Sequence, residues 1–237
     1  MEDDKPGAGQ EWRENWPLLT AAMAGISFGA IPTATLGVFM EPLQDEFGWS
    51  RASLSLGLMI FALVSTPLSP FAGALVDRFG ARAVAIPGVA LCGLSFAAFS
   101  LMTGSVAFWL AVWMTYSLCA LLIRSMVWNR AVSAAFVKSR GLAIAGLLSG
   151  TSLAGALAPI TTQLLTEAFG WRGAYLVLGL GWAGIAWILV ILFFREKAEP
   201  VVSDSHAPVR RTIPGGLTYG EALRSPVMIR IAVAVLL

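Results

Sequence analysis

Long apolar runs separated by short polar connectors dominate the first 194 residues of the chain. Each run reaches the ~20 residues that an α-helix needs to cross ~30 Å of hydrocarbon. A membrane-spanning β-barrel would instead show ~10-residue segments of alternating hydrophobicity, so the pattern predicts helices. The six predicted spans are residues 17–40, 52–75, 83–103, 106–128, 142–163 and 174–194.

The segments that flank the spans are polar or short. Residues 1–16 form a polar N-terminal tail, and the run that follows lacks the basic region of a cleaved signal peptide. Residues 195–225 are rich in Pro, Gly and charge, which is typical of a flexible linker. Residues 226–237 would span only ~18 Å as a helix. We therefore expect an all-α polytopic membrane protein with a six-helix bundle over 17–194, a linker and a truncated seventh helix.

Composition agrees with an integral membrane protein. Hydrophobic residues make up 57% of the chain and charged residues 13%, whereas soluble domains carry about 25% charged residues. A net charge of +2 gives no indication of nucleic-acid binding. The only histidine, His206, and the two cysteines in apolar runs, Cys92 and Cys119, form no recognisable metal or nucleophile pattern. We expect no metal, no cofactor and no enzymatic activity.

The distribution of Lys and Arg predicts the orientation, because basic residues gather in cytoplasmic connectors. Arg51 and Arg172 lie on one side, and Arg124 and Arg230 lie within apolar runs. The other side carries twelve of the sixteen basic residues: Lys5, Arg13, Arg78, Arg82, Arg130, Lys138, Arg140, Arg195, Lys197, Arg210, Arg211 and Arg224. We therefore expect a multi-pass protein of the cell (inner) membrane with a cytoplasmic N-terminus.

A charged turn, Gly73-Ala-Leu-Val-Asp77-Arg78-Phe-Gly80-Ala-Arg82, connects the second and third predicted spans. Unpaired charges are costly in hydrocarbon, so the turn belongs at a membrane surface, where Gly80 can adopt a positive φ. Asp77 is not needed for a basic cytoplasmic turn. It implies a partner, either an adjacent Arg or the positive N-terminal end of another helix. The alternative is a local salt bridge that only fixes the turn.

This turn resembles the signature loop of the major facilitator superfamily, in which a Gly and an Asp four positions on precede an Arg, a Gly and a basic pair. Ala81 replaces one basic residue of that pair. The matching residues are Gly73, Asp77, Arg78, Gly80 and Arg82. The resemblance implies the N-terminal half of a two-half transporter, with this loop in the cytoplasmic gate and a C-terminal half as partner.

A second stretch, from Phe136 to Gly150, has an aromatic residue, basic residues, Leu-Ala and spaced glycines. It resembles the loop between helices four and five of the monocarboxylate-porter and oxalate-formate-antiporter branch of that superfamily. Together with the turn Phe47-Gly48-Trp49-Ser50-Arg51, the resemblance covers about residues 17–195. It implies an antiporter or symporter of small organic anions, monocarboxylates or dicarboxylates, that works by alternating access. The tryptophans of this turn and of the similar turn at Trp171 are expected at headgroup level.

The fourth span carries Tyr116, Ala120, Arg124 and Trp128 at four-residue spacing. An arginine inside a span is a functional-site hypothesis, since a guanidinium can bind a carboxylate through two hydrogen bonds. Arg124 lies ~27 Å along this helix, so a side chain that extends to the headgroups is the alternative.

In the first span, Thr33 lies in a stripe of small residues with Gly25, Gly29 and Gly37. Such stripes usually let helices pack closely, and the alternative is a lining for a solute cavity. The candidate substrate-binding residues are Arg124, Tyr116, Thr33 and Trp128.

Two other functions remain open: a six-helix sensor or scaffold that keeps the fold without transporting, and a transporter of another solute class. A cavity-facing Arg124 favours transport, whereas a fully packed apolar bundle axis favours the scaffold. The third and sixth spans carry almost no polar residues and are expected to face lipid.

Overall fold

The computed structural model describes residues 7–195, and the structural statements below concern this part of the chain. Within these residues no strand occurs. The predicted linker beyond Arg195 and the truncated helix at 226–237 lie outside the described residues. The helices are α1 (Ala8–Phe47), α2 (Arg51–Phe79), α3 (Ala81–Ala97), α4 (Val106–Ala120), α5 (Ser125–Ala135), α6 (Arg140–Leu176) and α7 (Ala183–Phe193), with the 3-10 turns η1 (Ala98–Leu101) and η2 (Leu121–Ile123) and the π-helical turn η3 (Val177–Trp182).

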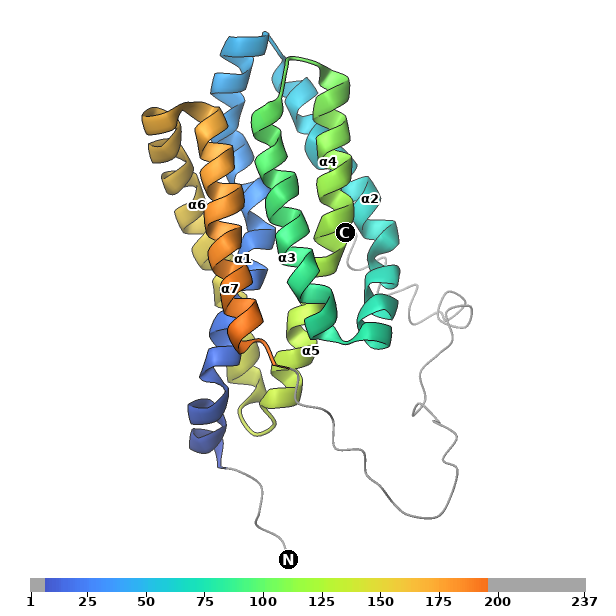
Figure 1. Cartoon of the computed structure of the whole chain (residues 1–237), viewed down its shortest axis with the longest axis vertical. Coiled ribbons are helices and arrows are strands. Elements are labelled where there is room, and N and C mark those ends of the chain that lie inside the picture. The colour runs from blue at the N-terminus through green and yellow to red at the C-terminus, as the bar shows by residue number, and fades with distance from the viewer. Residues whose placement is uncertain (1–6, 196–237) are drawn as a thin grey trace, which may run out of the picture. The chain divides into compact units, whose positions relative to one another are not determined.

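Five helical stretches are long and apolar enough to cross a membrane, and their helices pack into one bundle (Figure 1). The third crossing joins α3 to η1, and the fourth runs from α4 through η2 into α5. The helical stretch Arg140–Phe193 is long enough for two crossings, and it reverses at Gly170, where φ is 71° and ψ is 168°. Side chains other than glycine rarely adopt that φ. The predicted all-α bundle of six spans is confirmed.

The helices extend beyond the apolar runs that predict them. The first begins at Ala8, within the predicted N-terminal tail, and ends at Phe47; the capping residue Gly48 donates its N–H to the carbonyl of Gln44 at 2.8 Å. The fourth crossing continues to Ala135 instead of ending at Trp128. Polar residues can continue a helix into the headgroup region because its backbone groups stay paired, so hydropathy sets a lower limit on helix length.

The bundle is assembled around α1 and α3. The first helix packs along α6 and α7, α2 packs against α4, and α3 packs against α4, η2, η3 and α7. The third span is the most enclosed, with 61% of its most apolar window buried, while α2 has only 17%. The third span therefore packs mainly against other helices but exposes one face that includes Leu91 and Leu94, and its contact with lipid stays a prediction. An apolar side chain suits lipid and a neighbouring helix equally, so composition alone does not separate the two.

The bundle has one strongly basic end. We call the end where α1 begins and α7 finishes the basic end, and the other the opposite end. Seven of the ten described Lys and Arg residues lie at the basic end: Arg13, Arg78, Arg82, Arg130, Lys138, Arg140 and Arg195. The opposite end carries Arg51 and Arg172, and Arg124 lies between the two ends.

Candidate functional site

The charged turn between α2 and α3 is held from both sides. Asp77, in the last turn of α2, accepts a hydrogen bond and ion pair from the guanidinium of Arg130 on α5. Arg82, in the first turn of α3, donates to the carbonyl of Ile191 on α7 at 2.9 Å. Between them, Gly80 takes the expected positive φ, 84°. The turn thus connects α2 to the fourth crossing and α3 to the sixth.

The partner of Asp77 is neither of the two that the sequence suggested. Arg130 lies 53 positions further along the chain and was identified only as one of the basic residues on that side. Its place near the end of the fourth crossing, opposite the end of α2, was the available signal. Asp77 therefore joins two spans instead of only fixing its own turn.

Two other residues that match the signature loop, Arg78 and Gly73, have separate contacts. The guanidinium of Arg78 lies over the ring of Phe79, 5.2 Å from its centroid. A Cβ added at Gly73 would lie 3.2 Å from the terminal methyl of Met126 on α5. The absence of a side chain at Gly73 thus lets α5 approach α2 one turn before Asp77.

Arg124 lies at a break in the fourth crossing. Its φ of −60° and ψ of 152° are not helical, so α4 and η2 end before it and α5 begins after it. Its guanidinium donates to the carbonyl of Ser65 on α2 at 3.0 Å. Ser65 is the midpoint of the 29-residue α2, ~21 Å from either end. The contact directs Arg124 to the middle of the bundle, which disfavours the headgroup alternative.

The break separates the four residues that share a four-residue spacing. Tyr116 is fully buried and packs against Phe61 of α2 and Phe96 of α3. The indole of Trp128 donates to the carbonyl of Ile123 at 2.9 Å, a group that the break leaves without its helical donor. Its ring is fully buried over Gly25 of α1. The structure thus brings Arg124 to α2 and Trp128 to α1, and it places Tyr116 in the aromatic core.

The small-residue stripe of α1 has two kinds of environment. A Cβ at Gly25 would overlap the ring of Trp128, and one at Gly29 would lie 3.8 Å from Ile123. Gly37 has no described heavy atom within 4 Å of such a position. Thr33 is exposed, and its hydroxyl donates to the carbonyl of Ala30 at 2.9 Å. The stripe therefore packs against the fourth crossing around Gly25 and lies open around Thr33.

Glu11 connects the start of α1 to the segment between α5 and α6. Its buried carboxylate accepts hydrogen bonds from the backbone N–H groups of Val137, Lys138 and Ser139 at 2.9–3.2 Å, and from the Ser139 hydroxyl at 2.9 Å. The N–H of Lys138 makes the largest contribution to lowering the pKa of Glu11, which burial opposes. One turn later, Asn15 donates to the carbonyl of Ala135 at 3.2 Å. Sequence reasoning missed this connection, since Glu11 reads only as part of a polar tail.

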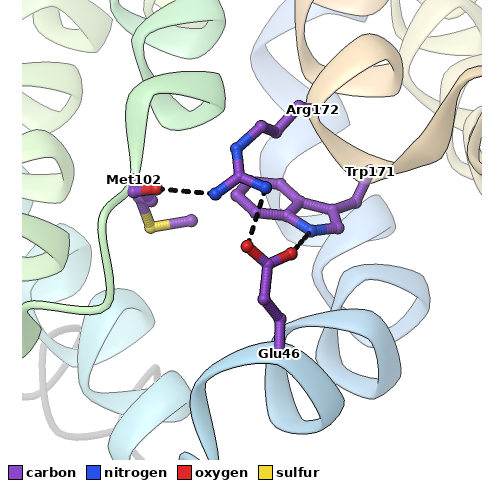
Figure 2. A network of polar contacts seen from close by, with 4 residues as sticks. All are labelled: Glu46, Met102, Trp171 and Arg172. Atoms are coloured by element: carbon purple, nitrogen blue, oxygen red, sulfur yellow. Dashed lines mark hydrogen bonds and ion pairs between the residues drawn. The ribbon is translucent and has the colours of Figure 1, made fainter.

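A second carboxylate connects the loops at the opposite end (Figure 2). Glu46 accepts from the indole of Trp171 at 2.6 Å and pairs with Arg172 at 2.7 Å. Arg172 also donates to the carbonyl of Met102 at 3.0 Å, and its guanidinium lies 4.1 Å from the Trp171 ring centroid. The bond from Trp171 is the main cause of the lowered pKa of Glu46. Trp171 and Trp49 are both buried and have aromatic neighbours, and their position at headgroup level stays a prediction.

Among the described residues no group of three or more His, Cys, Asp or Glu side chains could hold a metal ion. The contacts that charged side chains make between elements instead fall into three regions. The basic end holds the Asp77 and Glu11 contacts, the middle holds Arg124, and the opposite end holds Glu46. Of these three regions of the described chain, only the middle one has a cation bonded halfway along α2.

The chain is similar in sequence to known transporters. A family model described as Major Facilitator Superfamily matches residues 18–237. The chain is 31% identical to human monocarboxylate transporter 11 over 169 residues, 69% of this chain and 35% of that protein. It is 33% identical to human monocarboxylate transporter 6 over 168 residues, 69% of this chain and 32% of that protein. Against the MFS transporter asaE of Aspergillus flavus it is 27% identical over 211 residues, 86% of this chain and 44% of that protein. The chain thus spans less than half the length of these relatives.

Proposed function

Because the chain belongs to the Major Facilitator Superfamily, we propose that it forms the N-terminal half of a secondary transporter for small organic anions. The substrate class is a monocarboxylate or dicarboxylate, and the mechanism is alternating access between two halves. Two relatives are named monocarboxylate transporters. The basic end is proposed to face the cytoplasm, because it carries most of the described Lys and Arg residues.

The observation that carries this proposal is the position of Arg124. Its guanidinium bonds to the midpoint of α2 through one nitrogen, and a guanidinium has further N–H groups with which to bind a carboxylate. The side chain also stands at the N-terminus of α5, where the unpaired N–H groups and the helix dipole favour an anion. A discontinuous span with a helix N-terminus at mid-membrane is a recurring arrangement for substrate sites in secondary transporters.

Thr33 is proposed to contribute a hydroxyl on the α1 side of the same path. It lies one turn beyond Gly29, which faces Ile123, the residue before Arg124. One turn of helix is ~5.4 Å. Its hydroxyl hydrogen is donated to Ala30, so the exposed oxygen of Thr33 can accept a hydrogen bond from a solute. Tyr116 and Trp128 remain candidate substrate contacts, supported only by their place on the same span.

The second half is proposed to cover the faces of α2 and α6. These helices expose a series of large apolar side chains: Leu56, Met59, Leu63 and Phe71 on α2, and Leu148, Leu153, Leu157, Ile160 and Leu164 on α6. The path between the halves would then have Arg124 on one wall. The contact of Asp77 with Arg130 is proposed to stabilise the state in which the basic end is closed.

The test is uptake of radiolabelled lactate into proteoliposomes that contain the transporter with both halves. We expect Arg124→Gln to reduce the apparent affinity for lactate roughly tenfold or more, because it removes a charge-assisted pair worth about 1.5–3 kcal/mol. Arg124→Lys keeps the charge but not the geometry of two parallel hydrogen bonds, so it should lose less affinity for lactate than Arg124→Gln. Lactamide, which has no charge, should be transported poorly by the parent and no worse by Arg124→Gln.

The controls separate transport from folding. Arg13→Gln removes an exposed cation at the basic end and should leave uptake unchanged. Vesicles that hold residues 1–237 alone should show no saturable uptake, because alternating access requires an opposing half. Parent-like lactate affinity in both Arg124→Gln and Arg124→Lys would contradict the assignment of Arg124. Saturable, stereoselective uptake by residues 1–237 alone would contradict the two-half proposal.

A further inference from the structure

Two hollows lie in series along the outer seam between α3 and α7. The first, at the basic end, has a volume of about 580 Å³ and is lined by Phe79, Arg82, Ala83, Ile86 and Arg195. The second, about 200 Å³, lies further along the same two helices and is lined by Ala90, Gly93, Leu94, Gly179, Leu180, Ala183, Gly184 and Trp187. We propose that the pair binds one anionic phospholipid, with the phosphate in the first hollow and an acyl chain in the second.

The first hollow has the charge that a phosphate group requires. Two arginines from different crossings line it, and no acidic residue is among its lining residues. One nitrogen of Arg82 is fixed on the carbonyl of Ile191 near the end of α7, which holds the guanidinium at the rim with its other N–H groups available. Basic pockets between spans at this depth bind anionic lipid headgroups.

Ala83 adds an acceptor for headgroup hydroxyls. Four residues later the chain has Pro87, which lacks an N–H, so the carbonyl of Ala83 has no helical donor. Phosphatidylglycerol carries both a phosphate for the arginines and hydroxyls for this carbonyl. A hollow with two cations and a free carbonyl thus fits that headgroup better than a zwitterionic one.

The second hollow has the surface that an acyl chain requires. Its lining is apolar, and its glycines bring the helices so close that a Cβ at Gly93 would lie 2.6 Å from Ala183. Trp187 stands where the two hollows meet, since its indole donates to the carbonyl of Ile86, which lines the first, at 3.1 Å. Ala83 and Leu94 are ~16 Å apart along α3. The seam therefore offers a continuous path from the membrane surface into the hydrocarbon region.

The experiment is native mass spectrometry of the purified chain, residues 1–237, with equal amounts of phosphatidylglycerol and phosphatidylcholine. The wild-type chain should retain phosphatidylglycerol in preference to phosphatidylcholine. Arg82→Gln/Arg195→Gln should lower that preference roughly 25-fold, about fivefold for each arginine near the headgroups. The double variant Arg13→Gln/Arg51→Gln changes the net charge equally and should keep the preference.

A second pair of variants tests the acyl path. A Cβ at Gly184 meets no described heavy atom within 4 Å, so Gly184→Leu should fill the hollow without separating the helices, and lipid retention should fall. Gly155→Leu is the matched control, since Gly155 is equally open on α6. If Arg82→Gln weakens folding because the hydrogen bond to the Ile191 carbonyl is lost, Arg195→Gln alone still tests the phosphate position.

Three results would overturn the proposal. The first is equal retention of the two lipids by the wild-type chain. The second is unchanged preference in folded Arg82→Gln/Arg195→Gln. The third is displacement of phosphatidylglycerol by inorganic phosphate, which would assign the first hollow to free anions instead of a lipid.

Discussion

Glu11 and Glu46 connect the two ends of α1 to loops that lie much later in the sequence. Each carboxylate accepts several hydrogen bonds: from backbone N–H groups at one end, and from the Trp171 indole and Arg172 at the other. A carboxylate is well suited to this role because it offers several acceptor sites. Both residues lie outside the apolar core, so each can stay ionised without the cost of a charge in hydrocarbon.

The pH dependence of stability tests the role of Glu11. Hydrogen bonds, first that from Lys138, lower its pKa in the folded chain, so the ionised form stabilises the fold above the unfolded pKa of about 4.3. This stability is lost as the pH falls through the lower, folded pKa. Thermal unfolding followed by tryptophan fluorescence should show a lower midpoint for Glu11→Gln than for the wild type at neutral pH. In acid, the midpoint of Glu11→Gln should decrease further by less than that of the wild type. Glu41→Gln, at an exposed position further along α1, should follow the wild type, and identical acid profiles for Glu11→Gln and wild type would exclude this role.

The ion pair between Asp77 and Arg130 tests whether the turn acts in transport or only in folding. Both side chains are substantially exposed, 77% and 42%, and exposed pairs contribute about 0.2–1 kcal/mol. Asp77→Asn and Arg130→Gln should therefore change the unfolding free energy little, yet each should slow lactate uptake by the two-half transporter to a similar extent. A double-mutant cycle that shows additive losses in uptake would mean that the two residues do not act as a pair.

At the scale of single elements, the glycine stripe of α1 has a packed part and an open part. Gly25→Ala would place a methyl group against the Trp128 ring, and overpacking of this kind costs about 1–3 kcal/mol. Gly37→Ala has open space and removes a flexible residue from a helix, so it should be neutral or stabilise by up to about 1 kcal/mol. Unfolding of both variants in the same detergent gives the comparison. Equal stabilities would indicate that Trp128 does not pack on α1.

The sequence predicts the spans better than their breaks. Hydropathy located every crossing because hydrocarbon imposes a minimum length of apolar helix, and Gly80 took its expected positive φ because that turn left few alternatives. The break at Arg124 was not predicted. Arg124 bonds to a carbonyl of α2 that is distant in sequence. The Trp128 indole bonds to Ile123 nearby, but the four-residue spacing from Tyr116 to Trp128 suggested an uninterrupted helix. Arg130 and Glu11 were missed for the same reason: their partners lie in other elements.

For the whole molecule, orientation is the property with the clearest test. Val137 and Asp45 are exposed at the basic end and the opposite end. In a background with Cys92→Ala and Cys119→Ala, Val137→Cys and Asp45→Cys should react with a membrane-impermeant maleimide from opposite sides, Val137→Cys only from the cytoplasm. Because both sites lie outside the spans, access depends on sidedness alone. Labelling of both from the same side would contradict the six-crossing topology.

The contact of Arg124 with Ser65 also bears on how the chain enters the membrane. An arginine at the centre of a span adds about 2.5–3.5 kcal/mol to the cost of insertion. The carbonyl that offsets part of this cost belongs to α2, which leaves the ribosome before the fourth crossing is made. Co-translational insertion of the fourth crossing is therefore expected to depend on α2 remaining beside the translocon. A substitution in the middle of α2 would then impair the membrane integration of a span whose arginine lies 59 residues later in the chain.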